Sequence, residues 1–165
     1  MWNLLIPYVR GRMKAVRLPR TLTNAKDLSV KLRKDVAMTV VRAAARALTG
    51  SVYISGGYDA ARSPGIRVTM AEPMLSKIRT VVPIPVGDEQ VVRANGVAQL
   101  LAGTALTLGV LPRLSAVVLA ASLVPSTLSG HSFWAIEDPD ARAMQRVQFL
   151  KNSAMLGGLL FATIN

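Results

Sequence analysis

The stretch SGHSFWAIEDPDARAMQRVQFLKNSAMLGG, residues 129–158, decides the fold of this chain. It leaves one apolar segment, passes through a short acidic turn and enters a second apolar segment. It also contains the only histidine, His131, and the string Gln-Phe-Leu-Lys-Asn at residues 148–152. A membrane helix is normally apolar at such a depth, so polar residues there indicate a specific role. The pattern predicts two helices joined by a polar turn.

The composition indicates a membrane protein. Of the 165 residues, 51% are hydrophobic and only 18% are charged, and the mean hydropathy is +0.36. Residues 94–111 and 114–136 contain no Lys, Arg, Asp or Glu. Both runs reach the roughly 18 to 20 residues that a helix needs to cross about 30 Å of hydrocarbon. The length allows one domain.

The net charge of +11 is concentrated in a basic N-terminal arm at residues 1–35, which holds nine of the twenty Lys and Arg residues. A basic segment directly before a membrane helix sets topology and contacts anionic lipid headgroups, so we expect no nucleic-acid partner. Two interpretations stay open, a surface helix anchored to lipid and a docking arm for a partner. The candidate lipid- or partner-docking residues are Arg10, Arg12, Lys14, Arg17, Lys31, Arg33 and Lys34.

The predicted fold is all-α: an integral membrane, antiparallel four-helix transmembrane bundle that follows the basic interfacial arm. We expect Gly56-Gly57 to end the first helix, and a short helix over residues 73–82, starting at Pro73, to lie at the membrane surface. Four crossings place both termini on one side, and the basic arm places that side in the cytoplasm, with the protein in the cell membrane. The membrane domain covers residues 36–165, with crossings at residues 36–58, 90–111, 114–133 and 143–164.

A set of polar residues does not suit a lipid environment. Helical spacing places some of them on common faces, and the topology brings all of them to the exterior half of one bundle. Asp59 joins them from the exterior end of the first helix. The set is Asn95, Gln99, His131, Gln148, Lys151, Asn152 and Asp59.

Three interpretations of this set remain open. The polar residues can hold helices together, form a pocket for a quinone or a small redox head group, or bind lipid. In a pocket, His131 would exchange protons because its pKa is ordinarily near neutrality. One His without any Cys gives no metal-ligand spacing, and the sequence has no phosphate loop, nucleophile elbow or dinucleotide fingerprint. We therefore expect no metal and no intrinsic cofactor, with a quinone as the candidate ligand.

Several strings in the second half of the chain resemble the DoxX family of small four-helix bacterial membrane proteins. They are Ser55-Gly56-Gly57, Arg93-Ala94-Asn95-Gly96, Gly130-His131-Ser132-Phe133-Trp134, then Arg142, Gln145, Gln148 and Phe149-Leu150-Lys151-Asn152, followed by Gly157-Gly158. The resemblance covers residues 43–165. It implies a four-helix membrane domain and a link to sulfur and thiol oxidation, since relatives include the membrane subunit of thiosulfate:quinone oxidoreductase. It also implies a polar site at His131, Lys151, Asn152 and Asn95.

Two functions follow from these features. The first is an accessory subunit that docks on other subunits of a membrane complex, or on a soluble redox partner, through its basic arm. The second is a quinone-linked oxidoreductase subunit whose polar site at the exterior end of the bundle binds the quinone head. The sequence lacks a complete catalytic set, which favours the accessory role, and we expect the chain not to be catalytic alone.

Overall fold

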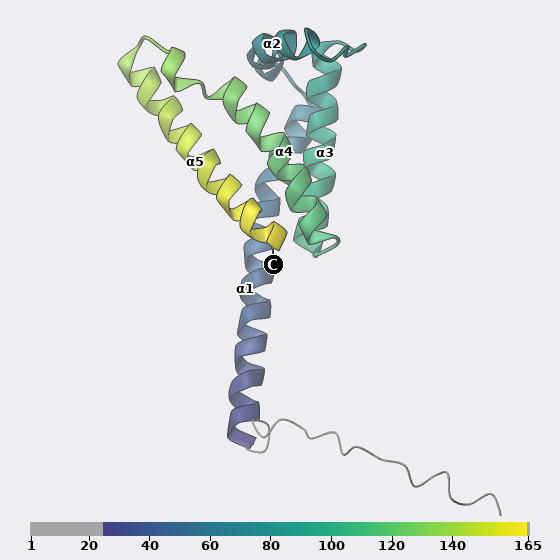
Figure 1. Cartoon of the computed structure of the whole chain (residues 1–165), viewed down its shortest axis with the longest axis vertical. Helices are drawn as coiled ribbons and strands as arrows, with labels where there is room; N and C mark the ends of the chain where they lie inside the picture. The colour runs from purple at the N-terminus through teal and green to yellow at the C-terminus, as the bar shows by residue number, and fades with distance from the viewer. Residues whose placement is uncertain (1–24, 165) are drawn as a thin grey trace, which may run out of the picture. The chain divides into compact units, whose positions relative to one another are not determined.

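The computed structural model describes residues 25–164, which form helices and connecting turns without any strand (Figure 1). The prediction of an all-α chain is confirmed over these residues. Arg10, Arg12, Lys14 and Arg17 lie outside them. The elements are α1 (Ala25–Arg62), α2 (Ile66–Arg79), α3 (Asp88–Leu108), α4 (Pro112–Gly130), the short 3-10 segment η2 (Phe133–Ala135) and α5 (Pro139–Ile164).

The chain divides into two compact units, and the boundary falls between Val40 and Val41 inside α1. The helix continues through residues 35 and 36, where the sequence predicts the arm to meet the first crossing. No Gly or Pro interrupts residues 25–49, which are rich in strong helix formers such as Ala, Leu, Lys and Arg. In the first unit, the predicted docking residues Lys31, Arg33 and Lys34 are exposed on this helix.

In the second unit the core centres on α4, which packs against α2, α3 and α5. Ala116 and Leu119 of α4 are fully buried, as is Leu159 of α5. Tyr53 of α1 and Leu106 of α3 complete the cluster from the other side. Residues from four helices therefore meet along one helix that is apolar over most of its length.

Helices α1 and α3 approach each other closely through two pairs of glycines. Gly50 lies against Gly103, and Gly57 lies against Gly96, and the two glycines of each helix are seven positions apart. A Cβ on Gly57 would stand 2.6 Å from the carbonyl oxygen of Gly96. Small residues allow such backbone contact between membrane helices. The expectation that Gly56-Gly57 ends the first helix is wrong, because Gly57 serves as a contact and α1 continues to Arg62.

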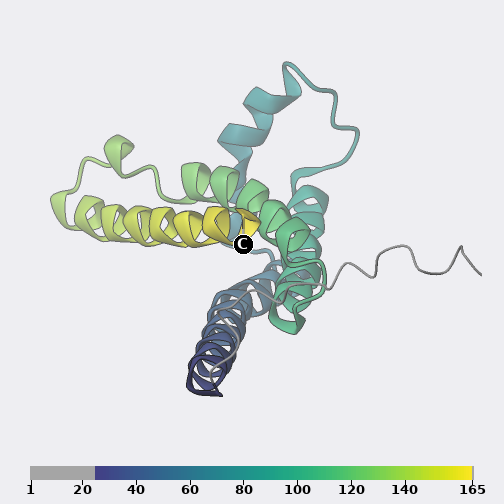
Figure 2. The same cartoon turned by 60° about the horizontal axis from the view of Figure 1, so that its bottom comes forward.

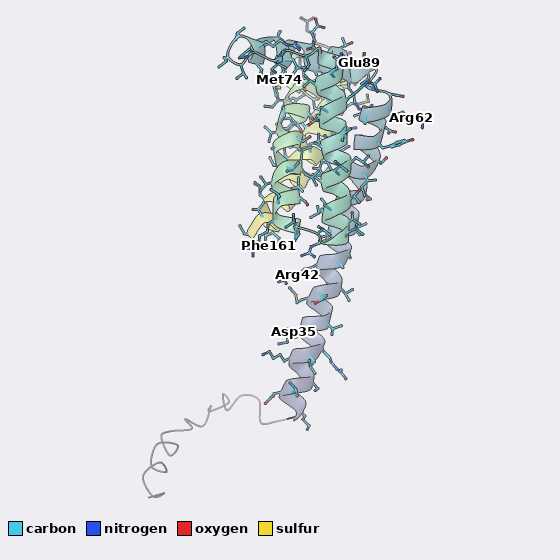
Figure 3. The ribbon with its side chains drawn as sticks, turned by 90° about the vertical axis from the view of Figure 1, so that its right-hand side faces the viewer. Asp35, Arg42, Arg62, Met74, Glu89 and Phe161 are labelled. Carbon is cyan, nitrogen blue, oxygen red and sulfur yellow. The ribbon has the colours of Figure 1, made fainter. Side chains whose placement is uncertain are left out.

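Helix α2 begins seven residues before the predicted start at Pro73, which lies inside the helix. Its start is set by Gly65, whose φ of 47° is a conformation that favours glycine. Figure 2 shows that α2 extends across the axis of the neighbouring helices, and its Leu75 is buried. In Figure 3, Met74 of α2 and Glu89 of α3 lie at the same end of the unit, whereas Phe161 of α5 lies at the opposite end.

The ends of the last three helices follow local capping signals. Helix α3 ends at Leu108, three residues before the predicted limit, because Gly109 adopts a left-handed φ of 72°. Helix α4 begins at Pro112 and ends at Gly130, against the predicted 114–133. Helix α5 begins at Pro139, ahead of the predicted 143, because the carboxylate of Asp138 accepts a hydrogen bond of 2.7 Å from the Ala141 backbone N–H.

Two stretches of the described residues are long and apolar enough to cross a membrane. They are Pro112–Ala135, with 24 residues, and Pro139–Ile164, with 26 residues. Only 6% of the apolar window of the second is buried inside the protein. Large side chains such as Met144, Val147 and Phe161 are consequently exposed on α5. These helices correspond to the predicted third and fourth crossings.

Candidate functional site

A cavity of about 670 Å³ lies within the second unit and is lined by residues of all five α-helices. This volume falls in the range of about 300 to 1,000 Å³ that is usual for small-molecule sites. Apolar side chains form most of its wall, and polar groups project from several directions. Five of the seven candidates that the sequence singles out line this cavity: Asn95, Gln99, His131, Lys151 and Asn152.

The other two candidates are not part of the lining. Asp59 is exposed near the end of α1, although its neighbour Ala60 lines the cavity. Gln148 is half-buried on α5, one turn before Lys151 and outside the wall. The structure therefore brings the predicted residues of α3 and the end of α4 together with Lys151 and Asn152, and it leaves Asp59 and Gln148 out.

Asn95 and Gln99 of α3 are joined to α4 through one serine. The Nε2 of Gln99 donates to the Oγ of Ser122 over 2.8 Å, and this hydroxyl donates to the Oδ1 of Asn95, also over 2.8 Å. Ser122 is only 7% exposed. Both amides therefore line the cavity and also hold two helices together, so the two interpretations of these residues are compatible.

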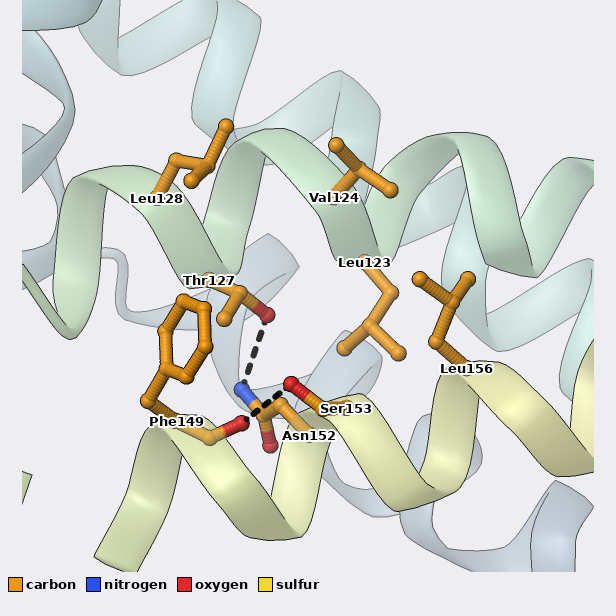
Figure 4. A pocket seen from close by; sticks show the side chains of 8 residues that line it. All are labelled: Leu123, Val124, Thr127, Leu128, Phe149, Asn152, Ser153 and Leu156. Carbon is orange, nitrogen blue, oxygen red and sulfur yellow. Dashed lines mark hydrogen bonds between the residues drawn. The ribbon is translucent and has the colours of Figure 1, made fainter. Parts of the chain in front are cut away.

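Asn152 makes the corresponding connection between α5 and α4. Its Nδ2 donates to the Oγ1 of Thr127 over 3.0 Å (Figure 4). A second, small apolar cavity of about 90 Å³ lies beside this bond, with Phe149 and Leu156 in its wall. Asn152 lines both cavities. It is thus a structural link between helices that also presents its amide to the larger space.

His131, directly after α4, is held by Gln145 of α5. The Nδ1 of His131 lies 2.7 Å from the amide oxygen of Gln145. Because an amide oxygen is an acceptor, Nδ1 is the donor of this hydrogen bond. Gln145 belongs to the quoted family strings but was not among the candidate site residues. The sequence feature that could have marked Gln145 is its position three residues before Gln148, on the same helix face.

Three further residues that line the cavity or hold its amides in place escape the sequence analysis. Arg67 lines the cavity from the first turn of α2, whereas the sequence predicts a helix that starts only at Pro73. Ser122 and Tyr53 lie inside apolar runs, where neither spacing nor charge marks them. Tyr53 is only 3% exposed, and its hydroxyl is buried without a hydrogen-bond partner. Such an unpaired buried hydroxyl is uncommon and calls for an explanation.

Aromatic residues surround the turn that carries His131. Phe133, Trp134 and Phe149 form edge-to-face pairs with ring centroids 5.2 to 5.8 Å apart. Arg142 holds the same turn through hydrogen bonds to the carbonyl oxygens of Ile136 and Glu137. These contacts fix the connection between α4 and α5 and keep His131 at the edge of the cavity.

Comparison with protein-family models, characterised proteins and solved structures gives no match to this chain. The resemblance to the DoxX family therefore stays a prediction. Among residues 25–164, no three His, Cys, Asp or Glu side chains gather to hold a metal ion. The arrangement that is present suits noncovalent binding, because amides, an imidazole and two cations project into an otherwise apolar space.

Proposed function

We propose that this chain is an integral membrane protein of the DoxX type, with four crossings and both termini in the cytoplasm. In this proposal it acts as an accessory subunit of a larger membrane complex with a redox association, and it holds an amphiphilic ligand in its cavity. The observation that carries the proposal is the cavity, whose size and mixed polar and apolar wall suit such a ligand.

The dimensions of the helices support four crossings. Helix α3 has 21 residues, which corresponds to about 31 Å at 1.5 Å per residue, close to the thickness of the hydrocarbon layer. Helices α4 and α5 are the two apolar stretches described above, and the part of α1 that packs on α3 is the remaining crossing. Helix α2 would then lie at the exterior surface of the bilayer.

The accessory role is tested by purifying the tagged full-length chain from its native membrane in a mild detergent. We expect the same partner proteins in constant ratio. Replacing Arg10, Arg12, Lys14, Arg17, Lys31, Arg33 and Lys34 by Gln should abolish their recovery, because docking is assigned to the charge of the arm. The matched control replaces the arginines of this set by Lys and keeps the charge. Equal recovery from the Gln and Lys variants would contradict docking through the arm.

A quinone-linked role is the second candidate, and the orientation of His131 favours it. Its Nδ1 is occupied by Gln145, so Nε2 is the ring nitrogen that remains for a ligand in a cavity of suitable size. In this role Nε2 would accept a hydrogen bond from the hydroxyl of a reduced quinone head. The replacements His131→Ala and Lys151→Ala should each weaken the binding of short-chain ubiquinol by about tenfold, the loss expected for one hydrogen bond to a charged or polar partner. Unchanged affinity in both variants would rule this role out.

A further inference from the structure

The charges that line the cavity have one sign. Arg67 of α2 and Lys151 of α5 belong to its wall, whereas none of the lining residues is Asp or Glu. Among residues 25–164, Arg79 pairs with Asp88 and Arg93 pairs with Glu89, whereas neither Arg67 nor Lys151 takes part in these ion pairs. Both side chains are exposed in the folded protein, and an anion in the cavity would gain charge-assisted hydrogen bonds from them.

The buried hydroxyl of Tyr53 is a second, independent feature of the same cavity. The residue lines the cavity, is 3% exposed and has no hydrogen-bond partner for its hydroxyl. Leaving a buried donor unpaired destabilises the folded state. A ligand oxygen that accepts from Tyr53 would remove this penalty, so the feature points to an occupant that carries acceptors.

Much of the remaining wall is apolar and flexible. It includes Met70 and Met74 of α2, Leu123 of α4 and Met155 of α5. Methionine side chains adapt to irregular hydrocarbon shapes. The wall therefore suits an alkyl or prenyl chain, whereas the two cations suit a negatively charged head.

We propose that the ligand of this cavity is an amphiphile with an ionised acidic head group, a carboxylate or a phosphate. Arg67 and Lys151 pair with the head, and the Tyr53 hydroxyl donates a hydrogen bond to one of the ligand's oxygens. The inference rests on the proposed function in one respect, that the cavity holds an amphiphile. A neutral head such as that of a quinone would leave both cations uncompensated, which is why an acidic head is favoured.

The test measures equilibrium binding to the purified full-length chain in nonionic detergent. The probes are oleate, dioleoyl phosphatidic acid, oleyl alcohol, ubiquinone-1 and inorganic phosphate. We expect at least one acidic amphiphile to bind about tenfold tighter than oleyl alcohol, since charge-assisted hydrogen bonds are about twice as strong as neutral ones. The ranking of oleate against phosphatidic acid identifies the head as carboxylate or phosphate.

Variants of the lining residues test whether the cavity causes the tighter binding of acidic amphiphiles. Arg67→Gln and Lys151→Gln should each weaken the acidic amphiphile by about tenfold and leave oleyl alcohol unchanged. Tyr53→Phe should weaken it by a smaller factor, about threefold, because one neutral donor is lost. Lys77→Gln on α2 and Arg146→Gln on α5 are the matched controls, since both residues are exposed and neither lines the cavity. The thermal midpoint of each variant verifies its folding.

The outcomes separate this inference from the proposed function. If oleyl alcohol or ubiquinone-1 binds as tightly as the acids, or if Arg67→Gln and Lys151→Gln behave like the controls, the acidic class is wrong while an amphiphile site stands. If inorganic phosphate binds as tightly as phosphatidic acid, the ligand is not an amphiphile. If the wild-type chain binds none of the probes, the proposed ligand cavity is itself wrong.

Discussion

At the scale of single residues, Ser122 links the polar groups of α3 to α4. Its hydroxyl donates to Asn95 and accepts from Gln99, so one oxygen atom satisfies two amides inside the bundle. Removing it would leave both amides without that partner at a position where water is scarce. The effect of this residue is therefore larger than its small side chain suggests.

We predict that Ser122→Ala lowers the free energy of unfolding by about 1 to 2 kcal/mol, because two interhelical hydrogen bonds are lost and each is worth about 0.6 to 1 kcal/mol. The measurement is the unfolding equilibrium in mixed micelles with increasing sodium dodecyl sulfate. Ser153→Ala is the control: Ser153 is exposed and bonds only to the carbonyl oxygen of Phe149 within its own helix. A loss for Ser122→Ala no larger than for the control would contradict the prediction.

At the scale of helices, the contact between α1 and α3 depends on the absence of side chains at four positions. Each of Gly50, Gly57, Gly96 and Gly103 lies against the backbone of the opposite helix. Arg93 adds to this contact, because its guanidinium donates to the carbonyl oxygens of Ala61 and Arg62 at the end of α1. It thereby satisfies carbonyl groups that a helix end leaves unpaired.

Adjacent glycines offer a matched comparison. A Cβ at Gly57 would meet the Gly96 carbonyl oxygen and the Leu100 amide nitrogen at 2.6 Å, whereas a Cβ at Gly56 meets nothing within 4 Å. We predict that Gly57→Ala destabilises the fold by about 1 to 3 kcal/mol through overpacking. Gly56→Ala should instead be neutral or stabilise by up to about 1 kcal/mol, since Ala favours the helix.

Thermal unfolding in detergent measures both variants. The expected result is a midpoint that falls for Gly57→Ala and holds or rises for Gly56→Ala. Equal midpoints for the two variants would show that α1 and α3 do not pack through this glycine.

At the scale of the whole second unit, the end opposite α2 carries basic residues in its helix connection. The turn between α3 and α4 carries Arg113 and no acidic residue. Arg46 reaches the same turn from α1, where its Nη1 lies 3.1 Å from the position of a Cβ on Gly109. Basic residues at short connections favour the cytoplasmic side. The α2 end, where Met74 and Glu89 lie, would then face the exterior (Figure 3).

The chain contains no cysteine, so single cysteines can report this topology without background. We predict that Ser63→Cys and Glu137→Cys react with a membrane-impermeant maleimide in intact cells, because the proposed topology places both positions in exterior connections. Val110→Cys should react only after permeabilisation. The three positions are exposed in the folded protein, so accessibility reports the side of the membrane. Labelling of all three from outside would contradict four crossings.

Part of the candidate site followed from periodicity alone. Asn95 and Gln99 are four residues apart, and Lys151 and Asn152 lie inside an apolar run, so helical geometry and the rarity of polar groups in lipid marked them. Tyr53, Ser122 and Arg67 could not be found in this way. Tyr53 and Ser122 are ordinary members of apolar helices, and Arg67 is one of many basic residues. Their importance arises from which helices pack against them.

The sequence by itself determined that the chain is all-α, that two apolar helices flank the His131 turn, and which amides stand out from apolar surroundings. These properties are local, since they depend on spacing and composition along one segment. Only the tertiary structure decided that α1 continues past Gly57 and that Arg67 of α2 lines the cavity. It also decided that the Tyr53 hydroxyl is buried without a hydrogen-bond partner. Such features depend on contacts between helices far apart in sequence, and only packing brings Gly57 to Gly96 and Arg67 to the cavity that Lys151 also lines.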